Sequence, residues 1–264
     1  MTLKSFSLTT SQLGKQLFYY DSCDSTNRIA VKLVQSSKAR HGAMVFAEFQ
    51  TQGRGQQEKT WESSPGDNLT FSLILFPDLA VADFFRLNVL VSLAVAKALN
   101  NWVKDPIRIK WPNDIFYHHQ KLGGILIQNN LQGALIRSSV VGIGLNVNQL
   151  HFNHPRAISL ANIRNQIIDR EQLLNEVLIC LENMQGELSV SDTDKLDRQY
   201  NDYLYGKGEK RTFEDNEGLF QGMISGVDKI GRLIIEVKDE PRYYNFHEVR
   251  YHWDLKEELL VLEL

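Results

Sequence analysis

The sequence predicts an α+β protein in which a larger domain, residues 1–206, is followed by a small β-barrel domain, residues 207–264. Short apolar runs such as 44–49 have the length and composition of buried strands. Residues 83–102 instead place their apolar side chains at helical spacing on one face. After Gly206 the pattern changes to short β-segments separated by turn signals, and about sixty residues of this kind are typical of a small barrel.

The first half of the larger domain combines strands with two helices. In chain order we expect a strand at 18–20, a helix at 27–34, strands at 44–49 and 68–76, and a helix at 83–102. The polar segment 21–26 offers several side chains that could cap the first helix. Pro77 ends the strand before the second helix.

The second half of this domain contains more strands and then two helices. We expect strands near 106–111, 114–118, 122–130 and 134–147, and helices at 170–188 and 192–205. Between them, residues 148–165 form a polar stretch rich in His, Asn and Arg, which predicts no regular element. Gly206 ends the last helix.

Length, charge and cysteine content restrict the class of protein. The 264 residues are 43% apolar and 23% charged, which is ordinary globular composition, and a net charge of −3 argues against extended nucleic-acid binding. Cys23 and Cys180 lie far apart and have no metal-ligand spacing, which favours free thiols in a reducing compartment. No apolar run approaches membrane-spanning length. We therefore expect a soluble cytoplasmic protein that binds neither nucleic acid nor membrane.

Four clusters of glycine, cation and amide follow or interrupt the predicted strands. They occupy residues 49–55, 110–114, 121–124 and 141–148. Glycine lets the backbone turn and approach a ligand closely, so that backbone amides can close on an anion. Lysine, arginine and asparagine add charge and hydrogen bonds. The clusters together predict a pocket for a small, partly anionic ligand.

With these clusters the chain resembles the biotin protein ligases, also called biotin–[acetyl-CoA-carboxylase] ligases. The resemblance covers nearly all of the chain and rests on five motifs in the family's order: Asp24-Ser25-Thr26-Asn27, Gly53-Arg54-Gly55 closed by Trp61, Lys110-Trp111-Pro112-Asn113-Asp114, Lys121 to Leu126, and Gly142 to Asn146. It implies a mixed central sheet flanked by helices, followed by an SH3-like β-barrel.

The resemblance also implies a reaction. Biotin and ATP would form biotinyl-5′-AMP with release of pyrophosphate, and biotin would pass to a lysine of a biotin carboxyl carrier protein. Only some twenty residues precede the first predicted strand, so we expect a monofunctional ligase and not a DNA-binding repressor. A lipoate or octanoate ligase or transferase of the same superfamily, and a biotin-binding sensor without turnover, are the alternatives. Monomer and homodimer both stay open.

Three residues are the candidates for catalysis. Lys121 would contact both the biotin carboxylate and the phosphate, and its alternative is a solvated lysine at a strand entry. Arg54 would lie in a loop that orders over the adenylate and excludes water. Asp114 would either join a magnesium shell made mostly by phosphates or accept a proton from the carrier lysine, and its alternative is a turn residue.

The biotin site implied by the resemblance has a polar end and an apolar wall. Ser25, Thr26 and Gln50 would pair with the ureido ring, although the two hydroxyls could simply cap a helix. Amides of Gly53 and Arg54 would reach the carboxylate end. The remaining biotin-binding candidates are Lys121, Gly124, Leu126, Gly142 and Leu145, of which the two leucines could equally be core.

The nucleotide site would be built from the same loops. The candidates for ATP and adenylate binding are Arg54, Trp61, Lys110, Asn113, Asp114, Lys121 and Asn146. Trp61 could stack on the base or be a buried structural residue. Lys110 could be a surface lysine, and both asparagines could be turn residues that fix their loops.

Two segments depart from the family pattern. Residues 56–60 read Gln-Gln-Glu-Lys-Thr where the family usually has further arginines, which predicts a weaker grip on the adenylate unless Lys59 compensates. The family also tends to place an arginine near the end of the barrel. Arg250 or His252 could replace it, and the sequence assigns no site residue there.

Overall fold

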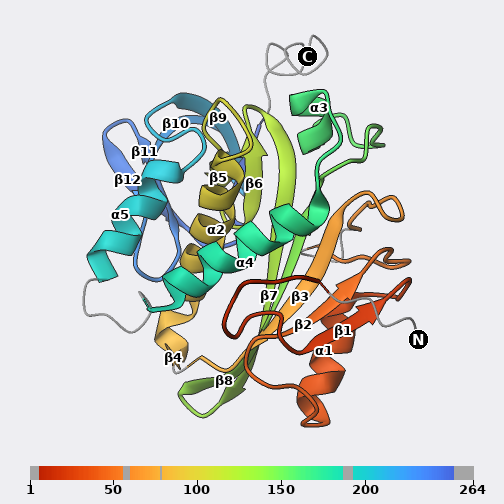
Figure 1. Ribbon diagram of the computed structural model, residues 1–264. Coiled ribbons are helices and arrows are strands. Elements are labelled where there is room, and N and C mark those ends of the chain that lie inside the picture. The colour runs from red at the N-terminus through yellow and green to blue at the C-terminus, as the bar shows by residue number, and fades with distance from the viewer. Residues whose placement is uncertain (1–5, 56–59, 78, 187–192, 253–264) are drawn as a thin grey trace.

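A mixed eight-stranded sheet forms the centre of the larger part of the molecule (Figure 1). The computed structural model describes residues 6–55, 60–77, 79–186 and 193–252. The strands are β1 Leu17–Tyr20, β2 Ala43–Ala47, β3 Leu69–Leu75, β4 Leu79–Ala80, β5 Arg108–Lys110, β6 Asp114–Tyr117, β7 Gln120–Gln132 and β8 Leu135–Leu145. Their order is β1-β2-β3-β8-β7-β6-β5, with β4 paired to β8. The β1–β2 pair is parallel and the other pairs are antiparallel.

Helices cover both faces of this sheet. They are α1 Thr26–Gln35, α2 Phe84–Asn100, α3 Leu160–Arg164, α4 Arg170–Gln185 and α5 Thr193–Tyr203. Because strand side chains alternate between faces, β2 contributes Met44 and Phe46 to the main core and Ala43 and Val45 to a smaller cluster under α1. The main core is covered by α2 and α4, which pack against each other, while α1 packs on β2, β3 and β8 (Figure 1).

A second, antiparallel sheet follows α5, in the region predicted to be a barrel. It consists of β9 Lys210–Asp215, β10 Gly218–Val227, β11 Leu233–Val237, β12 Glu240–Tyr244 and β13 Arg250–Tyr251, in the order β12-β11-β10-β9-β13. The turn before β11 joins it to the larger part, because Trp111 Nε1 donates to Gly231 O at 2.9 Å. Phe246 packs on the same tryptophan, with 5.2 Å between ring centroids.

The predicted α+β class and the mixed sheet flanked by helices are confirmed, with corrections at individual elements. The polar stretch contains a helix, α3, which is stabilised by a capping box between Ser159 and Asn162. The strand predicted to reach Trp111 ends at Lys110, since residues 111–113 form the turn that pairs Lys110 with Asp114 of β6. Residues 253–264 of the predicted barrel lie outside the described residues.

The start of α1 also differs from the prediction. Ser25 is the N-cap residue, but its side chain makes no capping hydrogen bond. The amide oxygen of Gln50 accepts the backbone N–H of Thr26 instead, at 2.8 Å. A side chain from a distant loop therefore satisfies this helix end, which no local pattern reveals.

Both cysteines are free thiols, as predicted. Cys23 lies between β1 and α1 and forms a parallel bridge with Gln50. Burial raises the pKa of its thiol to about 11, and the charge of Asp24 acts in the same direction. Among the described residues, none of the helices is both long and apolar enough to cross a bilayer.

The contact between the second sheet and α2 can be tested at a glycine. Gly231 has φ +91° and an added Cβ would lie 2.6 Å from the Phe85 ring, whereas Gly218 has φ +117° and open space around it. Both Gly→Ala changes should cost about 1–2 kcal/mol for left-handed backbone. Gly231→Ala should lose about 1–3 kcal/mol more through overpacking. Urea unfolding measures the difference, and equal losses would contradict this contact.

The raised pKa of Cys23 predicts slow alkylation. Because the thiolate is the reactive form, iodoacetamide should modify Cys23 of the folded protein slowly at pH 8 and increasingly fast towards pH 11. In urea the rate should follow a pKa near the ordinary value of 9.0. Mass spectrometry of the modified peptide gives both rates, and Cys23→Ser provides the background from Cys180. A folded-state midpoint near pH 9 would disprove the shift.

Candidate active site

A patch of the sheet that carries no side chains forms the floor of the site. In the strand register Gly142 lies between Ser72 of β3 and Leu126 of β7, and Gly144 lies opposite Gly124. Directly paired residues share a face, so these glycines and Leu126 all face the side of the sheet covered by α1. The patch is thus open to groups that approach from other elements.

Each glycine of the floor is in close contact with a side chain. An added Cβ at Gly144 would lie 2.6 Å from the Trp61 ring, and one at Gly142 would overlap the Asn27 amide. At Gly124 the nearest atoms, from Lys121 and Trp61, would be 3.4 Å away. Glycine is therefore required at Gly142 and Gly144 for these side chains to pack directly on the backbone.

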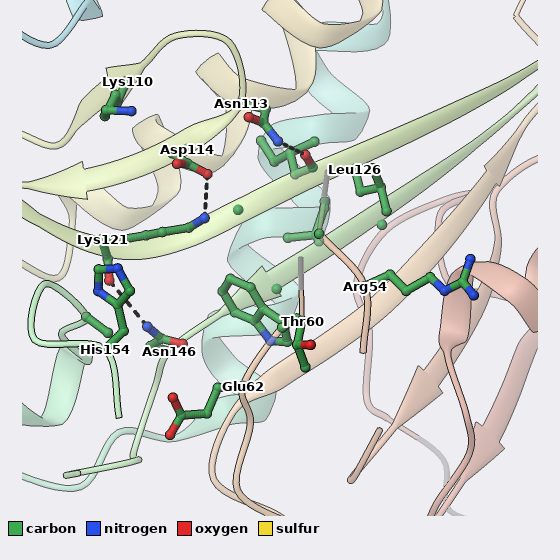
Figure 2. A pocket seen from close by; sticks show the side chains of 18 of the residues that line it. Arg54, Thr60, Glu62, Lys110, Asn113, Asp114, Lys121, Leu126, Asn146 and His154 are labelled. Atoms are coloured by element: carbon green, nitrogen blue, oxygen red, sulfur yellow. Dashed lines mark hydrogen bonds and ion pairs between the residues drawn. The ribbon is translucent and has the colours of Figure 1, made fainter. Parts of the chain in front are cut away.

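A cavity of about 550 Å³ opens above this floor (Figure 2). Thirteen of the fifteen predicted site residues line it: Ser25, Thr26, Gln50, Arg54, Trp61, Lys110, Asn113, Asp114, Lys121, Gly124, Leu126, Gly142 and Asn146. Gly53 is not among the lining residues and packs against Trp61.

Leu145 does not line the cavity, contrary to the prediction. It is fully buried and belongs to the main core on the opposite face of the sheet. Its neighbour Gly144 faces the cavity, and consecutive strand residues point to opposite sides. The strand alternation in the motif 142–146 could have revealed this.

An ion pair stands at one end of the cavity. Lys121 Nζ lies 2.6 Å from Asp114 Oδ1, and the two side chains are 35% and 22% exposed (Figure 2). The ammonium is also 5.7 Å from the centroid of the Trp61 ring. The backbone of Lys121 is held on both sides, since its N–H donates to Arg156 O and its carbonyl accepts from Ile158 N. The arrangement presents a fixed, partly shielded cation to an anionic ligand.

The opposite end of the cavity is polar and largely buried. Ser25 and Thr26 are only 2% and 3% exposed. Gln50 Oε1 accepts from Thr26 N at 2.8 Å and lies 3.2 Å from Thr26 Oγ1. Hydroxyl and amide groups held in this way can recognise a ligand that carries both donors and acceptors.

The two predicted asparagines fix loops around the cavity. Asn113 Nδ2 donates to Ile125 O at 2.5 Å, and Ile125 N donates back to Asn113 O at 3.0 Å. Asn146 Nδ2 donates to Ile158 O at 3.1 Å and to Lys121 O at 3.3 Å. Nucleotide binding and loop fixing were both left open for these asparagines, and the contacts described here are of the loop-fixing kind. Asn146 also helps to hold Lys121.

The remaining predicted residues lie around the rim. Lys110 Nζ lies over the ring of Tyr251, 4.5 Å from its centroid, so a cation of the first sheet rests on a residue of the second. Arg54 is exposed, and Figure 2 shows its side chain extending away from Lys121 and Asp114. The altered loop residues 56–59 lie outside the described residues. Trp61 Nε1 is buried and has no hydrogen-bond partner in the described part of the chain.

Several lining residues were not predicted. Asn27 was part of a quoted motif but received no role, and its neighbours in space explain why: it contacts β7 and β8, which are distant in sequence. Strand β13 and the loop before it contribute a further set to the wall, namely His247, Val249, Arg250 and Tyr251. Of the two C-terminal candidates, Arg250 lines the cavity and His252 does not. Only the packing of the two sheets reveals this.

Comparisons with known proteins agree with this geometry. The model of the biotin/lipoate A/B protein ligase family matches residues 19–146, from β1 to the end of β8. The Bifunctional ligase/repressor BirA of Bacillus subtilis is 31% identical over 239 residues, which cover 89% of this chain and 73% of the relative. The biotin–[acetyl-CoA-carboxylase] ligase of Paracoccus denitrificans is 26% identical, over 80% of this chain and 90% of the relative.

The fold matches solved structures as well. The biotin protein ligase from Aquifex aeolicus in complex with biotin and ATP superimposes with a TM-score of 0.75 and 25% identity, over 90% of this chain and 100% of that one. The similarity in sequence thus extends beyond the cavity motifs to most of the chain, and the similarity in structure covers the same extent. On this evidence the chain belongs to the biotin/lipoate A/B protein ligase family.

Proposed function

We propose that this protein is an ATP-dependent biotin protein ligase. It forms biotinyl-5′-AMP from biotin and ATP, and it transfers biotin to a specific lysine of a biotin carboxyl carrier protein, such as that of acetyl-CoA carboxylase. The observation that carries the proposal is the shape and polarity of one cavity. A lysine–aspartate pair stands at one end, a largely buried donor–acceptor end lies opposite, and a glycine floor connects them.

The floor fits the short alkyl chain of biotin. Asn27 Nδ2 reaches Leu126 O at the polar end, while Lys121 lies over Gly124. Gly124 and Leu126 are two positions apart in β7, which corresponds to about 7 Å. A short chain with a ureido ring at one end and a carboxylate at the other spans such a distance. The Leu126 side chain and the bare glycine backbone provide apolar contact along it.

The first step joins two anions. A carboxylate oxygen of biotin forms a bond to the α-phosphorus of ATP, and the bond to the leaving pyrophosphate breaks. The residues therefore act mainly by positioning and by neutralising charge. Lys121 can serve both partners, since an ammonium has three donors and Asp114 occupies one. We assign Arg54, Trp61 and Lys110 to the nucleotide side of the site, where Asn113 and Asn146 fix the surrounding loops.

The second step transfers the acyl group. The ε-amine of the carrier lysine attacks the biotinyl carbonyl, AMP leaves, and the amine loses a proton. Asp114 is the carboxylate that we assign to accept it. Magnesium would neutralise phosphate charge in the first step, and Asp114 is its candidate protein ligand. The described residues contain no group of three or more metal-binding side chains, so phosphates would supply most of its ligands.

The polar end of the cavity favours biotin over lipoate or octanoate, the alternative substrates within the family. A saturated acyl chain or a dithiolane ring has no N–H or carbonyl group to pair with the Thr26 hydroxyl and the Gln50 amide, so it would cover these polar groups without offering them a ligand partner, which is costly. A reducing cytoplasm fits the two free thiols.

Removing the Lys121 ammonium tests the first step. Lys121→Ala should reduce pyrophosphate release from biotin and ATP by about 100-fold or more, the effect of losing a charge-stabilising donor. Lys229→Ala is the matched control, because Lys229 also pairs with an aspartate, at 3.1 Å, but on the exposed surface. Near-normal release by a folded Lys121→Ala protein would contradict the assigned role.

The complete reaction is tested by mass spectrometry. A purified biotin carboxyl carrier domain, incubated with this protein, biotin, ATP and magnesium, should gain one biotinyl group at a single lysine and gain none without ATP. Modification by lipoate or octanoate in place of biotin would reassign the substrate. Tight biotin binding without pyrophosphate release would indicate a sensor.

A further inference from the structure

A buried serine outside the ligand motifs stands directly behind the polar end of the cavity. Ser72 of β3 is fully buried and does not line the cavity. Its Oγ lies 2.6 Å from Asn27 Oδ1 and 2.7 Å from Thr26 Oγ1. It pairs with Gly142 in the sheet, so it is on the same face as the glycine floor.

The direction of the hydrogen bond from Ser72 follows from Asn27. A backbone carbonyl only accepts, so the Asn27 group 3.2 Å from Leu126 O is the amide nitrogen. The amide oxygen of Asn27 then faces Ser72, and it too only accepts. Because Ser72 has a single hydroxyl proton, this proton is directed to Asn27. The glycine at 142 provides the space in which Asn27 takes this position.

The proton of Thr26 is fixed in consequence. Because the Ser72 proton is directed to Asn27, the Thr26 hydroxyl is itself the donor in its contacts. It donates either to Ser72 Oγ or to Gln50 Oε1. Its lone pairs then remain for the cavity. Gln50 lines the cavity, and because its Oε1 already accepts from the N–H of Thr26, its Nε2 is the donor that it can offer to a ligand. The cavity therefore presents an acceptor at Thr26 and a donor at Gln50.

We infer that Ser72 and Asn27 are positioning residues that set the polarity of this subsite for a cyclic urea. A urea has N–H donors beside a carbonyl acceptor, which matches an acceptor at Thr26 and a donor at Gln50. The inference rests on the proposed function and extends it to two residues that need not touch the ligand. Reversed polarity at Thr26 would set a donor against a urea N–H and weaken the complex.

Ser72→Ala is the direct test. The KM for biotin in pyrophosphate release should rise about tenfold, equivalent to about 1.4 kcal/mol. The KM for ATP and kcat should stay within about twofold, because the change acts only on the urea end. Desthiobiotin, which keeps the urea ring, should lose affinity by the same factor. Ser92→Ala is the matched control, since Ser92 is also fully buried and its hydroxyl has no partner among the described residues.

A double-mutant cycle with Thr26→Val separates positioning from a general packing effect. If Ser72 acts through the Thr26 hydroxyl, Ser72→Ala should weaken biotin much less in the Thr26→Val background than in the natural protein. The inference would be overturned if the increases in the KM for biotin caused by the two single changes simply multiplied in the double variant. An unchanged KM for biotin in Ser72→Ala would overturn it as well. Ser72→Cys, a weaker donor of similar shape, should give an intermediate KM and replaces Ser72→Ala should that variant not fold.

The proposed function and this inference fail in different ways. If the unsubstituted protein releases no pyrophosphate with biotin and ATP, the proposed function is wrong. If the unsubstituted protein is active but Ser72→Ala leaves the KM for biotin unchanged, only the inference about Ser72 is wrong.

Discussion

The candidate site depends on one constraint, namely that part of the central sheet carries no side chains. Gly142 and Gly144 leave the backbone of β8 open, and Gly124 does the same in the paired strand β7. Only because of this can Asn27 and Trp61 pack directly on the strands. Groups from a helix, from a distant loop and from the second sheet thus meet over one floor. The glycines do not contribute chemistry, but they decide which residues can come together.

The lysine–aspartate pair positions charge in the site and contributes little to the free energy of unfolding. Both side chains are partly exposed, and pairs of this kind contribute about 0–1 kcal/mol. The contacts that hold Lys121 belong to its backbone and come from Arg156, Ile158 and Asn146. The main chain is thus fixed while the ammonium keeps donors for an incoming anion. Such preorganisation lowers the cost of gathering charge when two anionic substrates meet.

Local patterns predicted the fold class and most elements, and thirteen of the fifteen predicted site residues line one cavity, because the motifs lie at strand ends. Leu145 was named as a lining residue because it belongs to a motif, whereas strand alternation supports the core position that was its alternative. Helix α3 was missed because five residues give too short a period. The positions of Ser72 and Tyr251 depend on register and on packing between sheets, which join residues far apart in sequence. No local pattern contains that information.

The two sheets lie on either side of residue 206 in the chain, and the division into two domains at that point stays a prediction. The contacts across it are nevertheless extensive. Trp111 donates to Gly231 O, Phe85 packs beside that glycine, and Tyr251 lies under Lys110. The second sheet also supplies part of the cavity wall. The second sheet covers buried aromatic side chains of the first part and contacts a cation of the site. The two sheets therefore form one functional unit, although they are formed by separate stretches of the chain.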